Sequence, residues 1–308
     1  MVPHTAPPVY PPIPPGRLAG AIVTADADAP RSPDGCRVAL LGLPDDTGVA
    51  MNHGRPGARE GPHAFRSALS RYGVAAQGDG LHLPRVFDAG DVLPGKSLHE
   101  THDRVSAAVS RLLDLGLLPV AVGGGHDLTW PLVRAVHQRS PLSRGLYLDA
   151  HLDVRPEPGS GMAFRRILED LRLPSLVNIG ANPIVNAREH WQWFLSKGGE
   201  IHPVGPGPDA IDESRLHPER FVCAGPGFVS IDLDAIDAAS APGVSALNPA
   251  GLSPRTAERF AFAAGRCPDT RCFDLMELNP SHDRDHQTAR LAVHLFITFL
   301  RGCAERFA

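Results

Sequence analysis

Short apolar runs alternate with amphipathic stretches along the chain from Cys36 onward. The apolar runs have the length of strands, and the amphipathic stretches have the spacing of helices that bury one face. Because this alternation repeats many times, it predicts an α/β fold in which helices cover both faces of a parallel sheet. The expected strands are Val38–Leu43, Arg85–Asp88, Leu118–Val122, Gly145–Leu148, Leu176–Ile179, Ile201–Val204, Phe228–Leu233 and Cys272–Glu277.

Helices are expected between most of these strands. Ser97, Thr129 and Ser253 stand at helix starts, where a hydroxyl can accept a hydrogen bond from the first turn. No internal repeat and no domain-scale linker follows residue 36, so residues 36–308 are predicted to form a single domain. The clearest helices are Pro62–Tyr72, Leu98–Leu115, Trp130–Gln138, Met162–Leu171, Asn186–Lys197, Pro254–Gly265 and Thr288–Phe307.

The N-terminal segment differs from the rest because residues 1–17 are rich in proline. Proline favours extended polyproline geometry and lacks a backbone donor, so this segment is predicted to build neither helix nor sheet. Asp and Pro recur between Thr24 and Gly35, which is typical of a loop. Residues 1–35 are therefore expected to be a flexible segment, with a docking site for a Pro-binding partner as the alternative.

Composition mainly excludes other classes of protein. The formal net charge of −4 gives no electrostatic reason to expect nucleic acid or an anionic membrane as partner. Five Cys without a CxxC pair indicate a reducing compartment and no disulfide framework. The N-terminus lacks a signal peptide, and the longest apolar stretch, Leu291–Leu300, is far shorter than the roughly 20 residues of a membrane span. We expect a cytoplasmic protein.

Acids and histidines gather at the ends of four expected strands. In open parallel sheets, ligands bind beyond the carboxyl ends of the strands, so these residues are predicted to share one site. The four runs are GGGHD at 123–127, DAHLD at 149–153, SIDLDAID at 230–237 and MELNP at 276–280.

The spacing within two of these runs favours a metal site. Asp149, His151 and Asp153 would share one face of an extended segment, and so would Asp232 and Asp234. Buried carboxylates that lie together repel strongly, and divalent cations remove that penalty. His and carboxylate ligands without Cys suit Mn²⁺ or a similarly hard ion better than a structural Zn²⁺.

Each run has a plainer interpretation when taken alone. A lone DxH or DxD is more often a cap, a turn or a surface feature. Gly123–Gly125 could cradle a phosphate, because it follows a strand and precedes a helix, but neither GxGxxG nor GxxxxGK[ST] is present. The combination of the runs, each at a strand end, favours the metal site.

Together these runs resemble a known family. GGGHD, DAHLD and SIDLDAID are similar to the three signature motifs of the arginase, agmatinase and formimidoylglutamase (ureohydrolase) family. Residues 241–245 (APGVS) and 277–280 (ELNP) also resemble it, and residues 52–62 fit its N-x-G-R-x-G-A-x-x-G-P motif. The resemblance covers residues 38 to 303. It implies a three-layer α/β/α catalytic domain with an eight-stranded parallel sheet and two Mn²⁺ ions per subunit.

The resemblance also implies roles for individual residues. A hydroxide that bridges two ions about 3.5–4 Å apart would attack the sp² carbon of an amidine or guanidine. Glu277 would pair with the cationic N–C–N group, and Asp153 could pass a proton to the leaving amine. Asp149 and Asp232 would bridge the ions. By motif position, one ion would be held by His126, Asp149, Asp153 and Asp232, and the other by Asp149, His151, Asp232 and Asp234.

Within the family, the chain is most similar to formimidoylglutamases. Arg155 and the stretch Ser160–Phe164 follow their pattern D-A-H-x-D-x-R and S-G-x-x-F, where arginases have Asn and an S-G-N-x-H-G stretch. A substrate with two carboxylates would gain from a guanidinium at the pocket rim. Arg155 is the first candidate for that contact and Arg55 the second, and Asn52, Ser160 and Glu277 are also expected to bind substrate.

The implied reaction is hydrolysis of N-formimidoyl-L-glutamate to glutamate and formamide, a step of histidine degradation. One alternative keeps the chemistry but releases urea from another guanidino or amidino compound, such as a guanidino acid, arginine or agmatine. Another is a non-catalytic, metal-binding oligomeric relative, which predicts a lost ligand, whereas all six ligand positions are filled. The expected partners are a small-molecule substrate and further copies of the chain in a trimer or hexamer, without nucleic acid or membrane.

Overall fold

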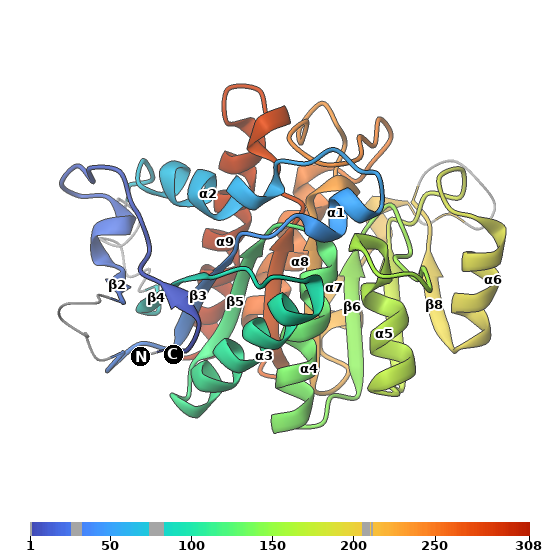
Figure 1. Cartoon of the computed structure of the whole chain (residues 1–308), viewed down its shortest axis with the longest axis horizontal. Helices are drawn as coiled ribbons and strands as arrows, with labels where there is room; N and C mark the ends of the chain where they lie inside the picture. The colour runs from blue at the N-terminus through green and yellow to red at the C-terminus, as the bar shows by residue number, and fades with distance from the viewer. Residues whose placement is uncertain (1, 26–32, 74–82, 205–209, 211) are drawn as a thin grey trace.

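The centre of the fold is a mostly parallel sheet (Figure 1). The structure, a computed structural model, describes residues 2–25, 33–73, 83–204, 210 and 212–308. Eight parallel strands lie in the spatial order β4-β3-β5-β10-β9-β6-β7-β8. They are β3 (Val38–Leu43), β4 (Val86–Val92), β5 (Leu118–Gly123), β6 (Arg144–Leu148), β7 (Ser175–Ile179), β8 (Gly199–His202), β9 (Gly227–Asp232) and β10 (Thr270–Met276).

These eight strands confirm the eight that the apolar runs predicted, with ends that differ by a few residues. The largest difference is at the end of β4, which runs four residues beyond the predicted Asp88, to Val92. The edge strand β8 was predicted two residues too late, because its apolar run begins at Ile201. Pairing with β7 begins at Gly199, where Leu176 lies opposite, and it ends at His202.

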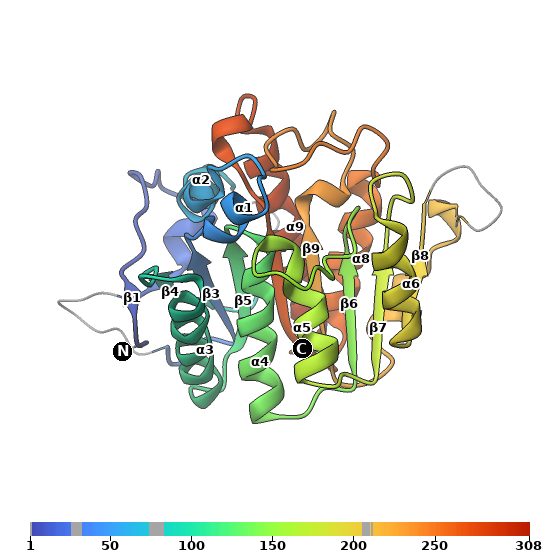
Figure 2. The same cartoon turned by 45° about the vertical axis from the view of Figure 1, so that its right-hand side comes forward.

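Helices cover both faces of the sheet, and each face buries its own apolar cluster (Figures 1 and 2). One face carries α3 (Leu98–Asp114), α4 (Thr129–Arg139), α5 (Ala163–Asp170) and α6 (Arg188–Ser196). The other carries α2 (Gly61–Leu69), α7 (Pro218–Val222), α8 (Pro254–Arg266) and α9 (Gln287–Arg306). In the part of the chain that the structure describes, no helix combines the length and the apolar composition that a membrane crossing requires.

Two of the three predicted N-cap residues cap a helix in the structure. The hydroxyls of Ser97 and Ser253 accept hydrogen bonds from the N–H groups of Glu100 and Thr256, as predicted. Thr129 is not a cap, because α4 includes it, and its hydroxyl donates to Asp274 instead. The sequence also did not predict α1 (Thr47–Met51) and α7, which are five residues each and too short for a clear period.

The Pro-rich segment contributes to the sheet, which corrects the expectation that it forms none. β1 (Thr5–Ala6) pairs antiparallel with β4, and β2 (Val23–Thr24) pairs parallel with the same strand. The hydroxyl of Tyr10 donates to Asp88 over 2.7 Å. Asp88 also accepts two hydrogen bonds from Arg66, a guanidinium that is only 1% exposed. Residues 1 and 26–32 of the predicted segment lie outside the described residues.

Two cysteines that are far apart in the sequence lie side by side in the fold. Cys223 and Cys267 meet at the ends of α7 and α8, with Cα atoms 5.7 Å apart. Cys36, Cys272 and Cys303 are buried thiols. A separation of 44 residues in the sequence hides this proximity, because only the packing of α7 against α8 brings the two residues together.

Candidate metal centre

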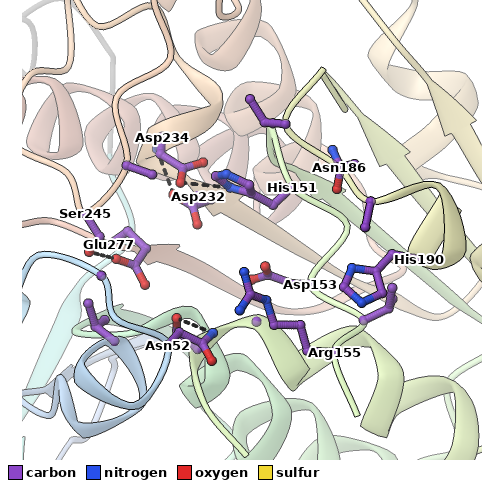
Figure 3. Close-up of a pocket in the computed structure, with 18 residues that line it drawn as sticks. Asn52, His151, Asp153, Arg155, Asn186, His190, Asp232, Asp234, Ser245 and Glu277 are labelled. Atoms are coloured by element: carbon purple, nitrogen blue, oxygen red, sulfur yellow. Dashed lines mark hydrogen bonds and ion pairs between the residues drawn. The ribbon is translucent and has the colours of Figure 1, made fainter. Parts of the chain in front are cut away.

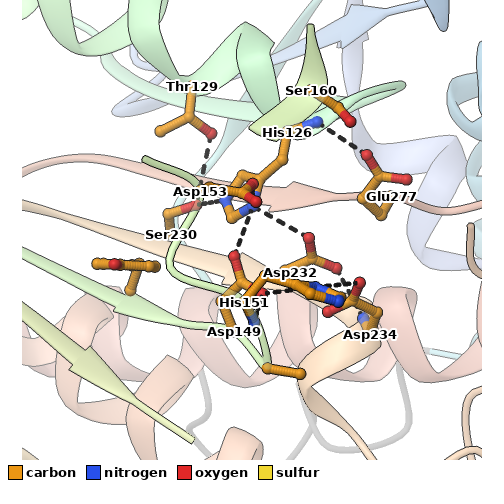
Figure 4. A network of polar contacts seen from close by, with 12 residues as sticks. His126, Thr129, Asp149, His151, Asp153, Ser160, Ser230, Asp232, Asp234 and Glu277 are labelled. Atoms are coloured by element: carbon orange, nitrogen blue, oxygen red, sulfur yellow. Dashed lines mark hydrogen bonds and ion pairs between the residues drawn. The ribbon is translucent and has the colours of Figure 1, made fainter. Parts of the chain in front are cut away.

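Four neighbouring strands deliver the acids and histidines to one edge of the sheet (Figure 4). His126 opens the 3₁₀ helix η4 (His126–Leu128) after β5, and the run 149–153 follows β6. Asp232 ends β9, where it pairs with Met276 at the end of β10, so Glu277 comes next on the neighbouring strand. Parallel register therefore brings these residues together although they are far apart in the sequence.

A histidine ring faces three carboxylates in the first group of ligand atoms. Nδ1 of His126 lies 3.1 Å from Oδ2 of Asp149, 3.2 Å from Oδ2 of Asp153 and 3.0 Å from Oδ2 of Asp232. The second group is formed by Asp149, His151 and Asp234. Nδ1 of His151 lies 3.4 Å from Oδ1 of Asp149 and 3.2 Å from Oδ2 of Asp234.

The structure thus brings together all six predicted ligand residues, with Asp149 in both groups. Asp232 belongs to the first group only, and its Oδ1 accepts a hydrogen bond of 2.7 Å from the N–H of Asp234. That Asp149 lies between the groups fits the expected bridging position. Bridging by Asp232 stays a prediction.

The electrostatics of the cluster fit divalent cations. Asp149, Asp232 and Asp234 are at most 3% exposed, and burial followed by their mutual repulsion raises the pKa values of Asp149 and Asp232. Nδ1 of His126, Oδ2 of Asp149 and Oδ1 of Asp234 are buried without a hydrogen-bond partner. Buried polar atoms are rarely left in this state, and cations among them would satisfy all three. Imidazole and carboxylate donors suit Mn²⁺ and similar ions.

On the side of the His126 ring away from the carboxylate cluster, hydroxyl groups form a chain of hydrogen bonds (Figure 4). Its Nε2 lies 2.9 Å from Oγ of Ser230, which donates to Asp274 over 2.5 Å, and Thr129 donates to the same carboxylate. Such contacts fix the ring orientation of a ligating histidine. The sequence analysis missed Ser230 and Asp274. The available signal was a polar residue inside each of two strands that are otherwise apolar.

Glu277 lies beside this cluster and is joined to it. Its Oε1 accepts a hydrogen bond of 3.0 Å from the backbone N–H of His126, and the hydroxyl of Ser245 donates to Oε2. Burial raises the pKa of Glu277 to about 8, and Asp234 adds to the rise, while the Ser245 hydroxyl opposes it. The nearby carboxylates therefore also favour a cationic group next to Glu277.

Two of the predicted catalytic residues have strained backbones. Glu277 has φ +64° and Asp153 has φ +47°, in the left-handed region that residues other than glycine rarely adopt. Such a conformation costs on the order of 1–3 kcal/mol and persists where surrounding contacts hold it. Both residues line the cavity that lies above the cluster.

A cavity of about 240 Å³ opens above the cluster (Figure 3). Arg155 lines it, and among the described residues its guanidinium has no hydrogen-bond or ion-pair partner. Gly161 makes room for this side chain, because a Cβ there would lie 3.0 Å from Cδ of Arg155. The guanidinium at the rim of this acidic site is therefore available to an anionic group of a ligand. The other lining residues include Asn52, His151, Asp153, Ser160, Asp232, Asp234 and Glu277.

The remaining predicted substrate residues lie in two different places. Asn52 and Ser160 both line the cavity, and their side chains are 3.1 Å apart, so each also ties the loop after β3 to the loop after β6. Arg55 does not line the cavity, which corrects the expected place of its side chain. Its guanidinium donates to the backbone carbonyls of Val244 and Ser245 instead.

Three further lining residues were missed in the sequence. Ser245 stands next to Glu277, Asn186 lies in the segment that leads into α6, and His190 lies in the first turn of α6. The side chain of Asn186 accepts from the N–H of Leu152 and donates to the carbonyl of Ala150, so it fastens this segment to the run 149–153. Ser245 ends the run 241–245, which resembles the family but was given no role, whereas Asn186 and His190 follow no motif that spacing alone could reveal.

Comparison with known proteins gives consistent matches. The model of the arginase family matches residues 36–301. A formimidoylglutamase from Ralstonia nicotianae is 35% identical over 304 residues, which cover 93% of this chain and 91% of that protein.

Solved structures with the same fold cover most of the chain as well. The Trypanosoma cruzi formiminoglutamase with Mn²⁺ superposes with a TM-score of 0.78 at 29% identity, over 90% of this chain and 96% of that one. The proclavaminate amidino hydrolase of Streptomyces clavuligerus superposes with a TM-score of 0.80 at 27% identity, over 96% and 99% of the two chains. The expected three-layer arrangement with a large parallel sheet is confirmed.

Proposed function

This chain belongs to the arginase family, and from that premise we propose that it is a manganese-dependent formimidoylglutamase. It hydrolyses N-formimidoyl-L-glutamate to glutamate and formamide. One observation carries the choice of substrate: a single cavity holds the carboxylate of Glu277 and the guanidinium of Arg155, which has no partner among the described residues. The first suits a cationic amidine and the second suits a carboxylate, and this substrate has both groups.

The buried cluster fits two Mn²⁺ ions. His126, Asp149, Asp153 and Asp232 would hold one, and Asp149, His151 and Asp234 the other. Asp232 is proposed as a further ligand of the second ion. When bound, the ions supply a water nucleophile that is activated near neutral pH. The formiminoglutamase of Trypanosoma cruzi, which is similar over 90% of this chain, was solved with Mn²⁺.

The residues of the chain orient the substrate and move one proton. Glu277 pairs with the cationic N–C–N group and places its carbon over the cluster. Attack forms a C–O bond, and the C–N bond to the glutamate nitrogen then breaks. That nitrogen needs a proton to leave as an amine. Asp153, which lines the cavity, would accept a proton from the attacking water and pass it to that nitrogen.

At the other end of the cavity, Arg155 binds a carboxylate of the substrate. Asn52 and Ser160 shape this end and are placed to hydrogen-bond the same group. An arginine is well suited here because its guanidinium binds a carboxylate through two parallel hydrogen bonds. Agmatine has no carboxylate and would gain nothing from it.

A panel of substrates tests the proposal. The Mn²⁺-loaded protein is offered N-formimidoyl-L-glutamate, arginine, agmatine and guanidinobutyrate, with glutamate or urea as the measured product. We expect glutamate from the first compound only, and its release should stop with a chelator. Release of urea without glutamate would show that the protein is a hydrolase of a guanidino compound and that the proposed substrate is wrong. No turnover of any compound would favour the non-catalytic relative.

We also propose a cytoplasmic homo-oligomer, a trimer or hexamer. Light scattering of the purified protein measures its mass and tests this directly. A monomer of 32.9 kDa would contradict it.

A further inference from the structure

Arg55 is held in an unusual way for a half-buried arginine. Its Nε donates to the carbonyl of Ser245 over 3.1 Å, and its Nη2 donates to the carbonyl of Val244 over 2.5 Å. Among the described residues, it forms no ion pair with a carboxylate. Two nitrogens of the guanidinium therefore donate hydrogen bonds to two successive carbonyls of the loop after β9.

Ser245, one of the two residues that Arg55 holds, contacts the carboxylate proposed to bind the amidine of the substrate. The hydroxyl of Ser245 donates to Oε2 of Glu277 (Figure 3). Any shift of the backbone at Ser245 moves this hydroxyl, so the position of Arg55 affects the orientation of Glu277. Oε1 is held separately by the N–H of His126, so the two oxygens are fixed by two different loops.

Asn279 connects the segment of Glu277 to the loops of Arg55 and Ser245, and we call this set of hydrogen bonds the ring. Its side chain donates to the carbonyls of Arg55 and Pro56 over 2.8 and 3.2 Å, and its N–H donates to the carbonyl of Gly243. Asn279 lies two residues after Glu277 on the same segment. The ring thus joins the loops that follow β3, β9 and β10.

This ring surrounds a residue whose backbone is strained. Glu277 has φ +64°, a conformation that needs support from its surroundings. Support from three loops keeps the carboxylate aimed at the cavity before substrate binds, and a preorganised carboxylate orients the amidine without a further entropic cost.

We propose that Arg55 is a positioning residue for the amidine end of the substrate, which acts through Ser245 on Glu277 and does not bind a substrate carboxylate. This inference rests on the proposed function of Glu277. A lysine cannot replace Arg55, because one ammonium lacks the planar fork that reaches both carbonyls.

A double-mutant cycle tests the connection. Arg55→Ala, Ser245→Ala and the double variant are compared for kcat and KM with the substrate that the wild-type protein turns over. We expect Arg55→Ala to lower kcat by about 10- to 100-fold, the range for a slightly misplaced reacting group. The double variant should lose little more than the worse single variant. Independent, multiplying losses would overturn the proposal.

Arg55→Lys separates positioning from charge. If Arg55 positions Glu277, this variant stays close to Arg55→Ala in kcat, with KM changed less. A lysine variant that restores the wild-type kcat would overturn the proposal, as would an Arg55→Ala variant in which only KM for the dicarboxylate rises. Arg59→Ala is the matched control, because Arg59 is in the same loop but is exposed and pairs with Asp46. We expect it to keep the wild-type kcat.

Further measurements distinguish a failure of this proposal from misfolding of the variant and from a wrong choice of substrate. Unfolding temperature and bound Mn²⁺ per subunit should stay near the wild-type values in Arg55→Lys. If the wild-type protein turns over a guanidino compound instead, the same cycle applies, because Glu277 would hold either cation. If no substrate is turned over, a crystal structure of Arg55→Lys decides: an unmoved Ser245–Glu277 hydrogen bond overturns the proposal.

Discussion

The backbone N–H of His126 donates a hydrogen bond of 3.0 Å to Oε1 of Glu277. These residues follow β5 and β10, which are neighbours in the sheet. The contact joins a proposed metal ligand to the carboxylate proposed to hold the amidine. Metal binding and substrate orientation therefore depend on the same short segment of backbone.

Removal of the cations should destabilise the protein. Without them, Asp149, Asp232 and Asp234 repel one another in a buried site. We expect Mn²⁺ at about 100 times its Kd to stabilise the chelated protein by about 2.7 kcal/mol, measured as a rise in unfolding temperature. Asp232→Asn should reduce this response, while Asp237→Asn, in the same motif but outside both ligand groups, should keep it. An unchanged unfolding temperature of the wild-type protein with Mn²⁺ would count against the metal centre.

Loss of Arg155 should weaken binding of the substrate more than it slows the reaction. Arg155→Ala removes the guanidinium from the cavity, and a hydrogen bond to a charged group contributes about 1.5–3 kcal/mol. We therefore expect KM for N-formimidoyl-L-glutamate to rise by about 10- to 100-fold with a smaller change in kcat. Arg166→Ala is the control, because Arg166 is exposed on α5 and pairs with Asp170. A KM that does not change in Arg155→Ala would exclude the carboxylate contact.

The buried carboxyl of Asp274 should make stability depend on pH. Burial raises its pKa from 3.8 to about 6. The folded state therefore binds this proton more tightly than the unfolded state, so the contribution to stability is present below pH 4 and is lost as pH rises through about 6. The difference corresponds to about 3 kcal/mol.

Asp274→Asn cannot ionise and should remove this contribution. Denaturant unfolding of the chelated protein at pH 5 and pH 7.5 measures it. The variant should lose less stability over this interval than the wild-type protein. Equal losses in the two proteins would mean that Asp274 does not titrate in this range.

The N-terminal segment should contribute to stability through Tyr10. Its hydroxyl donates to Asp88, which also pairs with the buried Arg66. Tyr10→Phe removes a hydrogen bond to a charged group, so we expect a loss of about 1.5–3 kcal/mol in the free energy of unfolding. Tyr72→Phe, which removes an exposed hydrogen bond to the carbonyl of Arg290, should cost less than about 1 kcal/mol. Similar losses in both variants would show that the buried ion pair does not depend on Tyr10.

The catalytic core was largely predictable because its signals are local. Each parallel strand is buried on both faces and so appears as an apolar run, and each ligand motif directly follows such a run. The alternation in DAHLD and SIDLD places its acids on one side without knowledge of any other segment. Five of the six proposed ligand residues lie in these two runs, and His126 was assigned through the resemblance of GGGHD to the family. The structure brings all six together.

Contacts between distant segments were not predictable. Arg55 was expected in the cavity because its motif and charge suited a carboxylate, but the loop after β9 offers its guanidinium two carbonyls. β1 forms because the edge of β4 is open to pairing, not because Thr5–Ala6 has a strand pattern. Asp274 looked like an isolated acid in an apolar strand, and only register with β9 placed Ser230 beside it.

The sequence by itself determined the layers of the fold and the chemical groups at the edge of the sheet, because burial and alternation act over a few neighbouring residues. Tertiary structure decided which of those groups meet, since the register of β5, β6, β9 and β10 sets the distances between their ends. It also decided that Arg155 faces the cavity without a partner among the described residues while Arg55 does not line it. The direction of a long side chain depends on which acceptors the folded chain places within its reach.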